Sequence, residues 1–162
     1  MAILKLSLED LFEHEEFTLI AIHCDLEQYR IAYLLNKHLK TVLKREYIDV
    51  VDIKQNTNYA LFEYLDINAD IIYNLVANHC KISTEKTIHS TNLFSKEKNN
   101  SETTYYLIPE QKKVTYFLKI NTVLTSAKTQ VILNKILEIP QVITAYYLNA
   151  ENLKSKNNLI FH

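Results

Sequence analysis

The chain has 162 residues, of which 48% are hydrophobic and 23% are charged, a composition typical of a soluble globular domain. We interpret residues 1–162 as one domain, long enough to bury a sizeable core. The formal net charge is −1, and only two of the 18 basic residues are arginine, Arg30 and Arg45. Because nucleic acids and anionic membranes bind clustered positive charge, this balance argues against both classes of partner.

The sequence contains no glycine, where roughly 7% is usual. Glycine-rich phosphate loops need a backbone without a Cβ atom, so dinucleotide-binding loops and P-loops are excluded, and we expect no cofactor. No run of about 18 apolar residues is present to span a bilayer. The N-terminal residues turn acidic within the first ten positions, unlike a signal or transit peptide. Cys24 and Cys80 are therefore expected to be reduced thiols in a cytoplasmic protein.

A strand followed by a helix is the clearest pattern in the N-terminal half. Residues 17–23 are apolar and predict a buried strand. Asp25 and Gln28 have the spacing of a capping box, which predicts a helix that starts there and ends near Lys40. The residues predicted to face the sheet recur at helical spacing and include Leu26, Tyr29, Tyr33, Leu35 and Leu39.

Three further strands are predicted before the middle of the chain. Residues 42–53, 59–65 and 71–78 are rich in β-branched and aromatic side chains, which favour strands. In the third of these, Asn74 and Asn78 lie on one side of the alternating pattern. We therefore expect that side of the strand to be partly hydrated.

A polar segment and a predicted hairpin follow. Residues 83–103 are polar and longer than most connections within a domain, so we interpret them as a loop, either a mobile insertion or a functional lid. Two apolar and aromatic runs, 105–108 and 114–120, then flank the polar insert 109–113. Pro109 has a φ suited to a turn and no N–H for a sheet ladder. We predict a β-hairpin in which these two runs pair.

The C-terminal part completes an α+β pattern. A second helix is predicted to be capped by Thr125 or Ser126 and to be stopped by Pro140, and residues 141–148 predict a final strand. The tail, 149–162, is polar with an apolar end. Two helices and mostly antiparallel strands predict an α+β fold with the helices on one face of the sheet, ferredoxin-like or an elaboration of it.

One motif resembles a known family. Ile108-Pro109-Glu110, followed after three residues by Val114-Thr115-Tyr116, resembles the motif of the bacterial family named IPExxxVDY. The helix segment 29–36 and the tail segment 153–161 resemble the same family, so the resemblance covers nearly the whole chain. Thr115 stands where the family has aspartate, which favours a structural role for this position. The resemblance implies no mechanism, because the family has no assigned activity.

Two His-Cys pairs are the candidates for chemistry. Zinc favours both residue types, but adjacent residues of a strand point to opposite faces, so His23-Cys24 and His79-Cys80 could together supply only two ligands. We therefore expect no metal site. Cys24 precedes a helix whose N-terminal field would lower the thiol pKa, although Asp25 opposes this. An enzyme of unrecognised type centred on His23, Cys24 and Asp25 is one alternative function.

The favoured function is a non-enzymatic interaction or regulatory domain that acts as a homodimer or through a protein partner. Many strands leave at least one sheet edge, and an uncovered edge is a template for strand addition. The competing expectation is that the N-terminal lead-in or the tail end, 159–161, covers that edge. The predicted partner-binding residues are Pro109 and Glu110 at the hairpin tip and Tyr116 beyond it. A small-molecule-binding domain is a further alternative, by analogy of fold.

Overall fold

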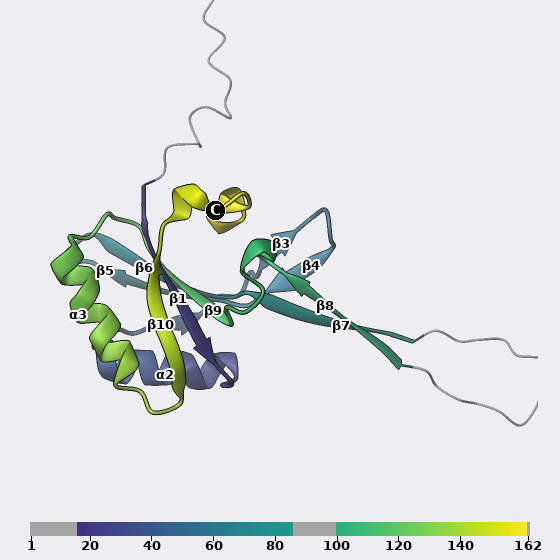
Figure 1. The fold of residues 1–162 in the computed structure, drawn as a ribbon, viewed down its shortest axis with the longest axis horizontal. Helices are drawn as coiled ribbons and strands as arrows, with labels where there is room; N and C mark the ends of the chain where they lie inside the picture. The colour runs from purple at the N-terminus through teal and green to yellow at the C-terminus, as the bar shows by residue number, and fades with distance from the viewer. Residues whose placement is uncertain (1–15, 86–99, 162) are drawn as a thin grey trace, which may run out of the picture.

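The computed structural model describes residues 16–85 and 100–161, and its centre is a six-stranded sheet (Figure 1). The six strands are β1 Thr18–Cys24, β2 Lys44–Arg45, β5 Leu61–Asp66, β6 Ile71–Ala77, β9 Tyr116–Ile120 and β10 Val142–Leu148. Their order across the sheet is β10-β1-β9-β6-β5-β2, and every neighbouring pair is antiparallel.

Two helices cover one face of this sheet, α2 Gln28–Leu39 and α3 Ser126–Leu137 (Figure 1). The α+β prediction is therefore confirmed. The order β10-β1-β9-β6, with α2 following β1 and α3 joining β9 to β10, is the ferredoxin-like arrangement, and β5 and β2 extend it at one side. No helix within the described ranges has the length and apolar character needed to cross a bilayer.

The buried face of α2 differs in part from the prediction. Leu35 is fully buried, but Tyr29 and Tyr33 are 61% and 67% exposed. Ile31 and Ala32 occupy the core positions instead, so the buried stripe is rotated toward the smaller aliphatic residues. The physical reason is that a tyrosine on the rim of a helix face keeps its hydroxyl in water. Ile31 has no polar group, so removing its side chain from water stabilises the fold.

The ends of the helices follow local rules with one exception. Thr125 caps α3, as predicted, and its side chain accepts a hydrogen bond from the backbone N–H of Lys128. The capping box at Asp25 is absent, because Glu27 occupies the N-cap position of α2 and makes no capping bond. Lys40 ends α2 near the predicted position, with a left-handed φ of 60°.

The other face of the sheet is covered by irregular segments and by a second core. The covering elements are β3 Val50–Asp52, β4 Thr57–Tyr59, η1 Pro109–Gln111, η2 Ala150–Asn152 and η3 Lys156–Leu159. Leu159 is buried there, and the buried Nζ of Lys119 donates to the Leu159 carbonyl at 2.8 Å and lies over the rings of Phe17 and Phe161. The apolar tail end therefore covers a face of the sheet.

The predicted hairpin between residues 105–108 and 114–120 is wrong. Strands β7 His79–Glu85 and β8 Asn100–Tyr106 pair with each other and form a ribbon that projects from the main sheet (Figure 1). Because β9 is paired on both sides, by β1 and β6, it has no free edge for the earlier run. The chain passes from β8 to β9 through the short helix η1.

Three smaller predictions also change. The polar segment 83–103 begins and ends within the β7–β8 ribbon, and its middle lies outside the described residues. The single strand predicted at 42–53 is divided between β2 and β3, and only β2 joins the main sheet. Asn74 and Asn78 are buried rather than hydrated. Asn78 is fully bonded: its side chain donates to the carbonyls of Gln111 and Val114 and accepts from the N–H of Ile108.

Candidate functional site

The free edge of β10 is the first candidate. β10 is the outermost strand of the main sheet and pairs only with β1. Within residues 16–85 and 100–161, no strand pairs with its outer side, and its first residue, Val142, donates its N–H to the carbonyl of Ile139 in the preceding turn. Ile143 forms a bulge, because His23 pairs with Thr144 and Cys24 with Val142. The regular part of the open edge is therefore 144–148.

Apart from the bulge at Ile143, this edge lacks the features that usually prevent strand addition. β10 contains no charged residue and no proline, and Ile143, Tyr146 and Tyr147 are exposed on it. The opposite edge is formed by the two-residue strand β2, Lys44–Arg45, which is short and charged. Short strands and charged residues protect sheet edges from pairing with another strand. The β2 edge has both features, and the β10 edge has neither.

The three predicted partner-binding residues do not form one surface. Pro109 and Glu110 are exposed in η1. Glu110 accepts hydrogen bonds from the backbone N–H and the hydroxyl of Ser155, so it holds the C-terminal segment. Tyr116 is buried and donates to the carbonyl of Leu26 at 2.6 Å. Its prediction as a partner contact is wrong, because β9 is an interior strand.

The residues of the enzyme alternative diverge in space. Cys24 is buried under the helices, and burial raises the pKa of its thiol, which disfavours the thiolate. His23, its neighbour along β1, points to the other face, where its Nε2 lies 3.2 Å from the hydroxyl of Tyr146. Asp25 is exposed in the loop that follows. A nucleophile and a base that face opposite sides of a sheet cannot act together.

The second His-Cys pair lies at the start of β7. Burial lowers the pKa of His79, with a smaller contribution from the charge of Lys81. Lys112 and Lys113 approach the same shallow cavity between β7 and the start of α2. Among the residues that the structure describes, no group of three or more histidine, cysteine or acidic side chains could hold a metal ion.

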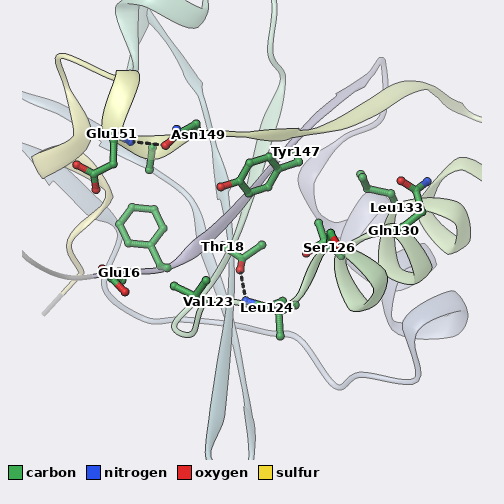
Figure 2. Close-up of a pocket in the computed structure, with 13 residues that line it drawn as sticks. Glu16, Thr18, Val123, Leu124, Ser126, Gln130, Leu133, Tyr147, Asn149 and Glu151 are labelled. Atoms are coloured by element: carbon green, nitrogen blue, oxygen red, sulfur yellow. Dashed lines mark hydrogen bonds between the residues drawn. The ribbon is translucent and has the colours of Figure 1, made fainter.

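A larger cleft lies where β1, α3 and the end of β10 meet. Figure 2 shows Thr18 and Tyr147 in the middle of this cleft, Glu16 and Glu151 at one end, and Gln130 on α3 at the other. Its volume is about 570 Å³, within the range of small-molecule sites. We call it the Tyr147 cleft.

Comparison of the chain with protein-family models, with curated proteins and with solved structures found no match. The function is therefore inferred from the geometry of the molecule.

An uncovered sheet edge was predicted from the sequence, but neither the strand that forms it nor the Tyr147 cleft was. A strand was predicted at 141–148, but the position of a strand within a sheet is set by long-range pairing, which local periodicity does not encode. One signal was present: the β10 segment VITAYYL is free of charge, which is unusual for a strand that lies at an edge.

Proposed function

We propose that this protein acts by self-association, as a homodimer in which two β10 strands pair across a two-fold axis. The observation that carries the proposal is the uncharged, unpaired outer side of β10 in a sheet whose other edge is short and charged. Pairing would join two six-stranded sheets into one and would satisfy the backbone groups that β10 leaves open.

A second copy fits this edge better than an unrelated strand for a reason of symmetry. A two-fold axis places the strand antiparallel to its own copy, so a charged residue near the axis would lie close to the same charge. β10 carries no charge, so its side chains meet those of the second copy without charge repulsion whichever residue lies on the axis. The small net charge of the chain, −1, adds little long-range repulsion between copies.

Light scattering on the full chain tests the proposal. We expect a mass of twice 19.0 kDa at roughly tens of micromolar, and monomer for the double variant Ile143→Lys, Thr144→Lys. Both residues are exposed, so the fold should be retained. The matched control is Val51→Lys, Ile53→Lys, which adds the same charge at exposed positions far along the chain and should stay dimeric.

A strictly monomeric parent chain would contradict the proposal. It would indicate that the residues before Glu16 cover the edge or that the edge stays open. If the double variant Ile143→Lys, Thr144→Lys is as fully dimeric as the control, β10 is not the dimer interface.

We also propose that the resemblance to the IPExxxVDY family reflects shared architecture. Its support is that the motif residues make structural contacts. Ile108 and Val114 are buried in one core. Glu110 accepts a hydrogen bond from Ser155, and Tyr116 donates one to the carbonyl of Leu26. Thr115 Oγ lies 3.3 Å from the backbone N–H of Cys24 and accepts a hydrogen bond from it. An aspartate at this position would offer the same kind of acceptor.

Two substitutions test this role of Thr115. Thr115→Val removes the acceptor from a buried N–H and should reduce the free energy of unfolding by about 1–3 kcal/mol. Thr115→Asp keeps an acceptor and should stay within about 1 kcal/mol of the parent. Urea denaturation measures both, and an aspartate variant as unstable as the valine variant would refute the structural account of the motif.

A further inference from the structure

We propose that the Tyr147 cleft binds a primary amine that carries an apolar body. The site adjoins the dimer edge but uses different groups: Tyr147 lies opposite Ile20, so its side chain is on the helix-bearing face, whereas strand pairing uses the backbone of β10.

The floor of the cleft is apolar. Phe17, Leu133 and Ala150 line it and are almost fully buried. Thr18 adds only its methyl group, because its hydroxyl already donates to the carbonyl of Thr122 at 2.8 Å and accepts from the N–H of Leu124 at 2.9 Å. Such a floor favours the burial of an aliphatic or aromatic body.

Three polar groups around this floor can accept a hydrogen bond from a ligand. The side-chain amide nitrogen of Gln130 donates to Asn134, which leaves the Gln130 carbonyl oxygen available to a ligand. The hydroxyls of Ser126 and Tyr147 have no hydrogen-bond partner within the described part of the chain, and each can accept. An ammonium group is a donor of three hydrogen bonds and accepts none, so it complements this set.

The acidic side chains of the lining also favour a cation, and they oppose the positive N-terminal field of α3 at Ser126. The lining contains two carboxylates, Glu16 and Glu151, and no lysine, arginine or histidine. Glu151 is paired with Lys156, whereas Glu16 has no ion pair within residues 16–85 and 100–161. Glu16 therefore supplies the uncompensated negative charge, and Figure 2 places it at the end of the cleft away from α3.

Three probes of equal length separate charge from apolar contact: hexylamine, hexanol and hexanoate. Each probe is titrated into the full chain, and binding is monitored by the NMR shifts of the cleft residues. We expect hexylamine to bind most tightly, hexanol less tightly and hexanoate most weakly. Glu16→Gln should weaken hexylamine by about threefold or more and leave hexanol unchanged, as expected for one partly exposed ion pair. Glu138→Gln, which removes an exposed carboxylate outside the cleft, should change neither affinity.

A further variant tests the location. Ser126→Phe places a bulky ring at an exposed lining position and should abolish the shifts caused by all three probes. Equal affinities for the three probes, an equal effect of Glu16→Gln and Glu138→Gln, or unchanged binding to Ser126→Phe would each overturn the proposal.

Discussion

Glu110 shows how one side chain of the family-like motif stabilises the fold. Its two carboxylate oxygens accept from the Ser155 N–H at 2.8 Å and from the Ser155 hydroxyl at 3.0 Å. Burial by itself would raise the pKa of Glu110, but the donors, led by the Ser155 backbone, outweigh it and hold the pKa below its ordinary value. The carboxylate thus joins η1 to the C-terminal segment most strongly in its ionised form.

The sign of the pH dependence follows from this direction. A carboxyl group with a lower pKa in the folded than in the unfolded chain stabilises the fold above the unfolded pKa, and this contribution is lost as the pH falls through the folded pKa. We therefore expect Glu110→Gln to be less stable than the parent near neutral pH, with a gap that narrows in acid. Urea denaturation at about pH 7 and about pH 3 measures the gap. A gap of equal size at both values would show that the charge of Glu110 contributes nothing.

Single side chains also explain where the sequence analysis failed. Asn78 was expected to face water because it is polar, yet it satisfies three backbone groups in the interior. Tyr29 and Tyr33 were expected in the core because their spacing is helical, yet both are exposed. Amphipathic side chains are compatible with either environment, so their burial depends on partners distant in sequence.

At the scale of single elements, α2 was predicted well in its extent and less well in its orientation. Its end lies at Lys40, whose backbone has the left-handed conformation that is common at helix ends. Its rotation about its own axis is set by packing on the sheet, to which Ile31 and Leu35 contribute.

Truncation on the two sides of α2 tests this orientation. Leu35→Ala removes a fully buried side chain and should cost about 2–5 kcal/mol of unfolding free energy. Tyr33→Ala, on the exposed side, should change stability by no more than about 0.5 kcal/mol. Chemical denaturation of both variants decides the matter, since comparable losses would mean that both sides of the helix are packed.

The hairpin that was wrongly predicted shows that local sequence does not specify which strands pair. Residues 105–108 and 114–120 both have the composition of strands, and a short polar insert separates them. Composition does not select a partner, however, and β9 becomes the central strand between β1 and β6. Nothing local in residues 114–120 distinguishes a central strand from one half of a hairpin.

At the scale of the whole molecule, the α+β class and the helices on one face were predictable because helical periodicity and strand composition are local signals. The two candidate surfaces were not predictable in position. The open edge exists because β10 pairs only with β1, and the Tyr147 cleft exists because Glu16, α3 and the end of β10 meet in space. Both depend on contacts between residues more than one hundred positions apart.

Backbone hydrogen exchange at two protein concentrations tests the central claim, self-association through β10, most directly. Strand pairing would give the outward N–H groups of 144–148 acceptors in the second copy, so their exchange should slow as the concentration rises. Exchange in β2, Lys44–Arg45, at the charged edge should not change with concentration. Exchange in 144–148 that is independent of concentration, or slowing confined to another part of the chain, would contradict the account.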